Sequence, residues 1–411
     1  MSFNKSKLAV AVAAAAGLTF SSGAFATNGI IQAGNGMAAH GLGGAGLSNA
    51  NEAMSGYDNP ALIGKTGDSI SMGFSIFMPD REIVEPAGLG GATVVSDSKM
   101  FAIPQVAFTS KINEAMSWGI MINALGGMNT DYRTGPTGTG SPQSVNLQGM
   151  IIAPTLSYAI NKNVTAGASL LVGYSTMTAR NLFANFGVPN GTFDDSAVGF
   201  GVKLGIDAKV ADGISVGAMI QPAMQADEFE SFKTFLNAFG YTGDASIALP
   251  NEAGVGAKFA VGNNMDIVAD ILYYQWTSNE VFKFFGWDDQ IVYKVGLEFR
   301  PSDKLALRAG LNYGESPIKG SNVTAPITTQ GGLPSNSAFA NYLFPAITTT
   351  HITVGLGYKM DKSMTFNAYY LHAPEASETA ATASLGGSFA AGTKISMTQN
   401  AFGLGLNYQS K

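Results

Sequence analysis

The chain has 411 residues, of which 23 are basic and 29 acidic, so its net charge is −6 and the charge balance does not suggest a nucleic-acid partner. The absence of cysteine excludes disulfides and thiolate metal sites. Only 13% of the residues are charged, about half the usual share, whereas 51 are glycine.

The N-terminal residues have the pattern of a secretory signal peptide. Lys5 and Lys7 precede the apolar run Leu8–Phe20, and Ala24-Phe25-Ala26 follows. The run is too short for a membrane-spanning helix, which needs ~20 residues. We therefore predict a signal peptide at residues 1–26, cleaved after Ala26. No later apolar run is long enough to span a membrane as a helix, so the exported chain needs a β-sheet explanation.

Residues 27–67 precede the first predicted strand and are rich in glycine and alanine. Gly41, Gly43 and Gly46 match the G-x-G-x-x-G pattern of dinucleotide-binding loops, but that motif requires a preceding strand and a following helix. A signal peptide precedes it instead. We therefore interpret the glycines as permitting tight turns and a close approach of this backbone to the rest of the protein. The residue before Pro60 avoids the helical region, which indicates an extended or turn conformation there.

From residue 69 onwards, apolar residues recur at every second position. In Val198–Ala208 every even position is apolar and every odd position is Gly, Lys or Asp, which is typical of a strand with one apolar and one polar face. Fourteen segments with this alternation are predicted as strands, at 69–79, 99–110, 116–126, 147–159, 164–175, 196–209, 214–224, 248–260, 265–276, 290–300, 304–315, 348–359, 363–373 and 396–408.

The connections between these segments alternate strictly between short and long. Tight links such as 111–115 and 301–303 alternate with much longer loops. A soluble β-sandwich needs no such asymmetry, whereas it is typical of outer-membrane barrels. We predict an all-β fold, a transmembrane antiparallel β-barrel of about 14 strands over residues 68–411 in the bacterial outer membrane. Residues 27–67 precede this barrel, and we call them the hatch.

Aromatic residues on the apolar faces of the strands support a membrane barrel, because aromatic girdles mark the two membrane interfaces. The residues that we expect to face lipid are Trp118, Tyr158, Tyr174, Phe200, Tyr293, Phe299, Tyr313, Tyr358 and Tyr408.

The inward-facing residues differ between the two halves of the barrel. Charged residues gather toward the short turns, which we place on the periplasmic side, and they are Lys203, Asp207, Glu252, Lys258, Asp266, Asp270, Lys294, Glu298, Arg308 and Lys359. The outer half is apolar, which predicts a ligand-binding lumen pocket formed by Phe77, Phe101, Ile103, Met121, Ile151, Leu171, Met219, Leu272, Tyr274, Trp276, Tyr369 and Leu371.

Two outer loops also carry apolar side chains. Residues 225–240 space their aromatics at three and four, which predicts an amphipathic helix. This helix and the preceding loop either pack on each other or form a groove that collects an apolar ligand. The groove residues would be Phe183, Phe186, Phe229, Phe232, Phe235, Leu236 and Phe239.

The whole mature chain resembles the FadL family, the outer-membrane transporters of long-chain fatty acids and other hydrophobic compounds. The similarity includes the hatch sequence Asn59-Pro60-Ala61, the segment from Ser117-Trp118-Gly119 to Gly126-Gly127, the strand 269–278 and the stretch 305–317. The C-terminus departs from the barrels that end on an aromatic residue, because Gln409-Ser410-Lys411 follow Tyr408.

The resemblance implies a monomeric fourteen-stranded barrel plugged by its N-terminal segment. It places the ligand groove at loops 177–195 and 225–247, and a lateral opening at a kink in the third strand, marked by Gly126 and Gly127. The partners it implies are a hydrophobic small molecule and the outer-membrane lipid with its lipopolysaccharide. Uptake would be passive. The resemblance identifies no head-group site, although Arg308, Lys203 and Lys258 are inward cations that either meet a carboxylate or pair with lumen acids.

Two other functions are weaker alternatives. A general porin would need an open, polar pore, and a lipid hydrolase would need a histidine beside a nucleophile. His40, His351 and His372 have no such neighbours in the predicted fold, so we expect no enzyme, cofactor or metal site. We interpret the acidic pairs Asp194-Asp195 and Asp288-Asp289 as solvated. The sequence leaves the ligand open between a fatty acid, an alkane, an aromatic compound and a terpenoid.

Overall fold

The computed structural model describes residues 27–85, 87, 91–133, 142–182, 191–238, 240–318, 342–379 and 392–410. The predicted signal peptide therefore lies outside the described residues, as do Phe183, Phe186 and Phe239. In the described part, no helix is long and apolar enough to cross a membrane.

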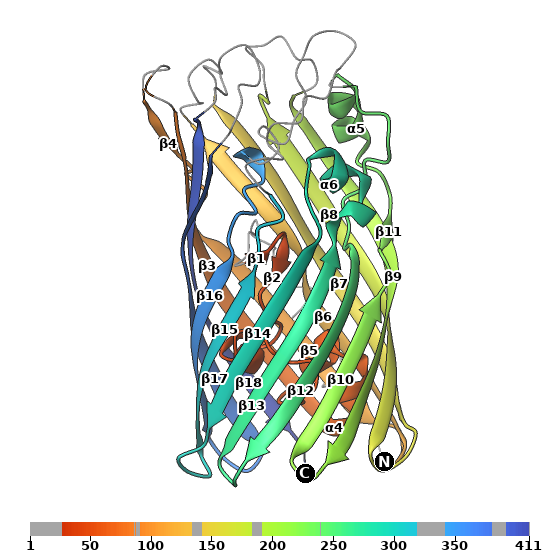
Figure 1. Cartoon of the computed structure of the whole chain (residues 1–411). Coiled ribbons are helices and arrows are strands. Elements are labelled where there is room, and N and C mark those ends of the chain that lie inside the picture. Colours follow the sequence, from red (N-terminus) through yellow and green to blue (C-terminus); the bar gives the residue numbers. More distant parts are fainter. Residues whose placement is uncertain are drawn as a thin grey trace.

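Fourteen long strands form one closed antiparallel barrel (Figure 1), which confirms the predicted fold. Each strand pairs with its neighbours in the chain, and β18 closes the barrel on β3. Short strands β4 (Thr93–Val95) and β11 (Gln225–Ala226) add to β3 and β9. The barrel strands are β3 (Ser69–Val84), β5 (Phe101–Lys111), β6 (Met116–Tyr132), β7 (Gln143–Ala159), β8 (Val164–Arg180), β9 (Phe193–Ala211), β10 (Ile214–Gln221), β12 (Asn251–Val261), β13 (Met265–Gln275), β14 (Gln290–Phe299), β15 (Leu305–Gly314), β16 (Thr350–Lys359), β17 (Met364–Thr379) and β18 (Lys394–Gln409).

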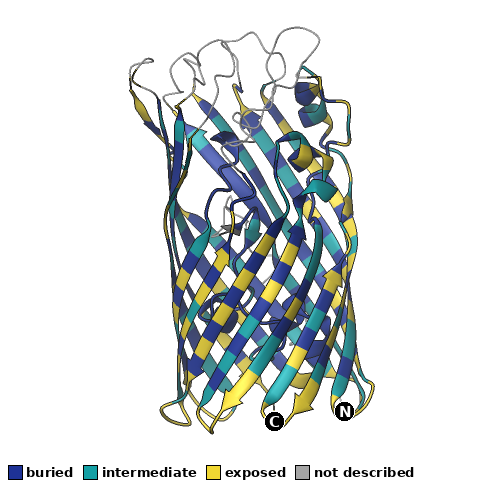
Figure 2. Ribbon diagram, viewed as in Figure 1, coloured by how far each residue is buried: buried dark blue, intermediate teal, exposed yellow. Residues whose placement is uncertain are grey.

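Burial alternates along the strands as their sequences predict (Figure 2). In β14, Ile291 and Tyr293 are exposed on the outside while Val292 and Lys294 are buried inside. Most of the predicted lipid-facing aromatics are likewise exposed, and Trp118 is half-buried beside Phe108. The strands that carry these aromatics therefore present the predicted face to the outside.

Several strands run further toward the long loops than the alternation of apolar residues indicates. β17 reaches Thr379 rather than residue 373, and β8 reaches Arg180 rather than residue 175. The extra residues include Glu375 and Glu378. In the added part of β8 the outward-facing residues are Thr176, Thr178 and Arg180, so apolar residues no longer mark the outer face of the strand.

The hatch lies inside the barrel (Figure 1) and is almost entirely buried. It contains the strand pair β1 (Thr27–Asn28) and β2 (Ile31–Gln32) and the short helices α2 (Met37–His40), α3 (Ser55–Asp58), η1 (Pro60–Leu62) and α4 (Ile63–Thr66). Pro60 begins η1, and the Asn59 side chain caps it by accepting a hydrogen bond from the Ala61 N–H. Tight turns join the helices, as expected for a segment packed in a narrow lumen.

Three further elements stand at the long-loop end. The predicted helix in 225–240 is confirmed as α5 (Glu230–Asn237), with narrower bounds. The alternation of apolar residues does not predict η4 (Trp276–Ser278) and α6 (Glu280–Phe284). The signal for α6 is Asn279, whose side chain accepts hydrogen bonds from Val281 and Phe282 N–H groups as an N-cap.

Candidate functional site

At the outer mouth, the aromatic side chains of α5 pack into a closed cluster. Phe232 lies 5.9 Å from Phe193 and 6.5 Å from Phe285, measured between ring centroids. Phe229, Phe235 and Leu236 are buried in the same cluster. The groove residues that the structure describes are thus brought together, but they face one another rather than solvent.

All predicted lumen residues point inward and are buried, and they divide into three groups. One group packs on Met37 of the hatch and contains Phe77, Phe101, Ile103, Tyr369 and Leu371. A second packs on Met54 and Tyr57 of the hatch and contains Met121, Ile151 and Leu171. Met219, Leu272, Tyr274 and Trp276 continue into the mouth cluster. The hatch therefore occupies much of the apolar space that the sequence assigns to ligand.

A small cavity remains between the hatch and the wall. Its volume is about 30 Å³, enough for about two water molecules. Leu125, Leu249, Leu272 and Tyr274 line one part of it. Ile31, Leu47 and Ala124 add apolar surface, and the polar or charged residues at the cavity are Gln32, Asn35, Asp58, Lys203, Gln221, Glu252, Asp270 and Lys294. The expectation of a wholly apolar pocket therefore differs from this cavity, because Asp58 comes from the hatch and the two halves of the lumen meet here.

The charged groups at the cavity are only partly paired. Lys203 contacts Glu252 at 3.6 Å and donates to the Tyr57 carbonyl at 3.1 Å. Asp58 accepts a 2.6 Å hydrogen bond from Asn35, while its other oxygen has no partner. Burial raises the pKa of the Asp58 carboxyl to about 7, against the opposing effects of Asn35, Lys294 and Lys203.

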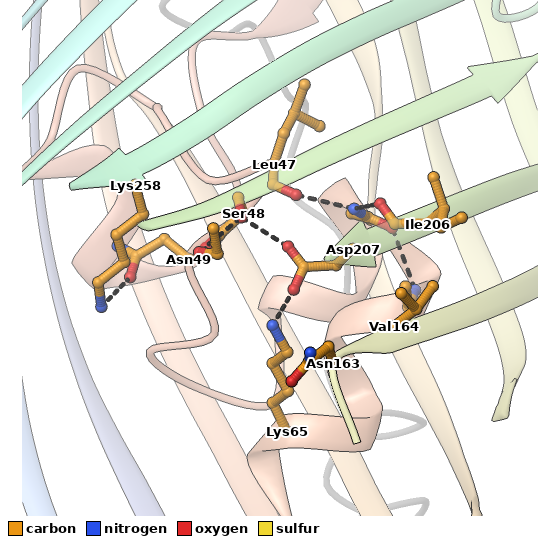
Figure 3. Close-up of polar contacts among 12 residues, drawn as sticks. Leu47, Ser48, Asn49, Lys65, Asn163, Val164, Ile206, Asp207 and Lys258 are labelled. Atoms are coloured by element: carbon orange, nitrogen blue, oxygen red, sulfur yellow. Dashed lines mark hydrogen bonds and ion pairs between the residues drawn. The ribbon is translucent and has the colours of Figure 1, made fainter. Parts of the chain in front are cut away.

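Charged residues of the lower wall anchor the rest of the hatch (Figure 3). Ser48 donates to Asp207 at 2.5 Å, and Lys65 contacts the other oxygen of the same carboxylate. The Gly46 and Leu47 N–H groups donate to Asp270 at 2.7 and 3.1 Å. The charged residues toward the short turns therefore hold residues 46–48 and Lys65 of the hatch.

The three inward cations considered for a ligand carboxylate all contact acids. Arg308 donates to Glu298 at 2.7 Å and Lys258 lies 3.0 Å from Asp266, while Lys203 faces Glu252. Of the two hypotheses drawn from the sequence, these contacts agree with pairing between the cations and lumen acids.

The hydrogen-bonded wall is interrupted between β5 and β6. Their pairing ends at Val106 and Ile122, although β5 continues to Phe101 with β3 and β6 continues to Tyr132 with β7. We call this unpaired stretch, residues 101–105 opposite 123–127, the wall break. Above it, the Asp97 N–H donates to the Asp131 carbonyl at 2.8 Å, so the break is closed at both ends.

The break coincides with the kink that the glycines indicate. The β6–β7 register shifts between Ala124 and Gly126, so Leu125 is an extra residue. Gly126 has φ +137°, and a Cβ there would lie 2.5 Å from the Ile30 carbonyl oxygen of the hatch. The Gly127 N–H donates to the same oxygen at 3.2 Å. Gly126 and Gly127 therefore lie where wall and hatch meet.

Two sets of polar residues at the break were not foreseen. Arg81 on β3 is buried, reaches the carbonyls of Asn129 and Ser98, and stands 5.7 Å from the Phe101 ring centroid. Gln32 of the hatch bridges the two edges of the break by hydrogen bonds to Gln105 and Asn123. Their inward phase could have been read from the strands, but no local pattern connects Gln32 with residues so far along the chain.

The histidines form no catalytic group. His40 stacks on Tyr369 with centroids 4.4 Å apart, and His372 contacts Asn400 at 2.9 Å. His351 is buried in the lumen phase of β16. Among the described residues, no cluster of acids or histidines suits a metal ion.

Comparison with known proteins identifies the family. Residues 12–411 match the model of the outer membrane protein transport protein family (OMPP1/FadL/TodX). None of the curated proteins compared with the chain matches it.

Solved structures share the fold. The toluene transporter TodX of Pseudomonas putida superposes with a TM-score of 0.68 at 16% identity, over 92% of this chain and 99% of that one. A FadL homologue of Pseudomonas aeruginosa gives 0.64 at 15% identity, over 93% and 99%. The toluene transporter TbuX of Ralstonia pickettii gives 0.62 at 15% identity, over 92% and 99%. With the family match over nearly its whole length, this chain belongs to the OMPP1/FadL/TodX family, whose members are outer-membrane barrels that transport hydrophobic compounds and are not enzymes.

Proposed function

We propose that this protein lets hydrophobic molecules, such as long-chain fatty acids or hydrocarbons, cross the outer membrane passively and leave sideways through the barrel wall. The wall break between β5 and β6 carries the proposal, because it is a stretch of barrel wall without ladder hydrogen bonds that borders the apolar lumen. A ligand released there would pass from an apolar lumen into lipid without entering water.

The route would begin at the outer loops. Phe232, Phe235 and Leu236 on α5 and Phe229 just before it would separate to take up a ligand and pass it to the lumen residues. We propose that Phe183, Phe186 and Phe239 also bind ligand in this groove. Ligand entry must displace packed rings at the mouth and hatch side chains below, so we infer that the described conformation is closed. We further propose that the protein works as a monomer within lipid and lipopolysaccharide.

The ligand within this class is either a fatty acid or a hydrocarbon. TodX and TbuX are described as toluene transporters, which supports testing a hydrocarbon as well as a fatty acid. The alternative of a general porin has less support, because the hatch is buried across the lumen.

Deletion of Leu125 tests the lateral route. Without the extra residue, β6 can pair continuously with β7 and lose its kink. Uptake of labelled toluene and dodecanoic acid by cells producing this variant should fall toward that of cells without the protein. Leu125→Val keeps the residue count and should retain uptake. Full uptake by a correctly folded deletion variant would refute lateral release.

A further inference from the structure

Two amide side chains line the wall break, and the residues near them on the same strands are apolar. Gln105 on β5 and Asn123 on β6 are 2% and 1% exposed. Phe101 and Ile103 lie on the same strand as Gln105, and Leu125 follows Asn123. Buried side-chain amides need hydrogen-bond partners, and here the hatch supplies them.

Gln32 supplies the contact that spans the break. Its amide nitrogen donates to Asn123 Oδ1 at 3.2 Å, and its oxygen accepts from Gln105 Nε2 at 3.2 Å. A ligand that leaves through the break must displace this side chain, since Gln32 connects the two edges.

The other contacts of the two wall amides do not depend on Gln32. Gln105 Oε1 also accepts from the Gly36 N–H at 2.9 Å. Asn123 Oδ1 also accepts from the Ala124 N–H at 2.9 Å, and its nitrogen donates to Asn35 at 2.5 Å. When Gln32 moves, the amide nitrogen of Gln105 is therefore the wall atom that loses its hydrogen-bond acceptor.

Building on the lateral route proposed above, we propose that Gln105 makes the wall break selective for hydrophobic molecules that carry a hydrogen-bond-accepting oxygen. An alcohol, ester or carboxylic acid can replace the oxygen of Gln32 on Gln105 Nε2. A hydrocarbon cannot, and it leaves a buried donor unpaired. For tails of equal length, passage of the oxygen-bearing molecule should be favoured about fivefold to tenfold.

The test compares labelled 1-dodecanol with dodecane in cells that have no other transporter of this family. The measured quantity is the ratio of the two initial uptake rates, after subtraction of the rates in cells without the protein. Gln105→Met should reduce the ratio about fivefold to tenfold, toward one. Gln32→Met removes the bridge but leaves the donor, so both rates should rise while the ratio is retained.

Gln290→Met is the matched control. Gln290 is a buried lumen glutamine on β14 whose amide donates to the Glu315 carbonyl at 2.7 Å, away from the break. Its loss should leave the ratio unchanged. If Gln105→Met does not accumulate as a folded barrel, Gln105→Leu also replaces the amide by an apolar side chain, and it should lose the preference too.

The outcomes separate this inference from the transport function. Equal uptake of the two probes by the natural protein, or an unchanged ratio in a folded Gln105 variant, would overturn selection by Gln105 while leaving transport intact. If neither probe enters faster than in cells without the protein, the proposed function fails and this inference fails with it.

Discussion

Replacement of Asn59 by alanine should loosen the hatch and make the barrel leak. The Asn59 side chain is fully buried and joins three parts of the molecule. Its nitrogen donates to the carbonyls of Leu47 and Ile206 at 2.7 and 3.0 Å, and its oxygen accepts from the Ala61 N–H at 3.1 Å. Alanine keeps none of these contacts.

The size of the effect follows from the groups left behind. The Leu47 carbonyl and the Ala61 N–H would lose a partner inside the barrel, at a cost of about 1–3 kcal/mol each. Because about 1.4 kcal/mol corresponds to a tenfold change in an equilibrium constant, even about 2 kcal/mol would raise the released fraction of the hatch roughly 30-fold.

Swelling of proteoliposomes in an isotonic sugar solution measures the leak directly. The Asn59→Ala protein should admit sugar faster than the natural protein. Asn161→Ala is the control, because the Asn161 side chain accepts from the Asn163 and Val164 N–H groups in an exposed turn. Sugar flux equal to that of the natural protein would show that Asn59 does not hold the hatch.

Two further predictions concern hatch stability. Burial raises the pKa of Asp58 to about 7, above the ~3.9 of an exposed aspartate. The packed hatch therefore retains a proton that the released hatch loses, and the stability of the packed hatch should fall as pH rises from about 4 to 7. Asp58→Asn should remove this contribution: the variant should gain over the natural protein in sugar-tightness as pH rises, and an identical pH profile would contradict the reasoning. His40, with a pKa lowered by burial to about 4, acts in the opposite direction below about pH 6.5 in both proteins and cancels in the comparison. Gly43→Ala should also increase the leak, because Gly43 has φ +69° and a Cβ would lie 2.7 Å from the Leu311 carbonyl oxygen, whereas Gly262→Ala, at φ +63° with open space, should not; equal sugar flux in the two variants would exclude the contact as the cause.

Local sequence was sufficient to predict the barrel because each strand carries its own signal. The kink of β6 at Gly126 and Gly127 is implied by the family resemblance, whereas alternation alone fixes which face of β14 meets lipid. Such features depend on residues within one strand or turn. The hatch sequence Asn59-Pro60 is local in the same sense, since it caps and begins η1.

The site could be predicted only in part, because its decisive contacts join distant segments. Gln32 meets Asn123 and Gln105 only after the hatch is folded into the barrel. Asp58 likewise adds a carboxyl to the cavity next to Lys203. Phe232 was expected at a groove, but periodicity cannot distinguish a ring that meets ligand from one that packs on Phe193 and Phe285.

The hatch contacts the barrel at two separate places, one that concerns the permeability barrier and one that concerns the passage of hydrophobic molecules. Residues 43–48 bond Thr353, Asp270 and Asp207 on three different strands, whereas the side chain of Gln32 bonds the edges of the wall break. On the proposed lateral route, movement of the Gln32 side chain at the break would leave the contacts of residues 43–48 in place. The outer membrane can thus keep its permeability barrier against polar antibiotics and sugars while a hydrophobic molecule passes through the same barrel.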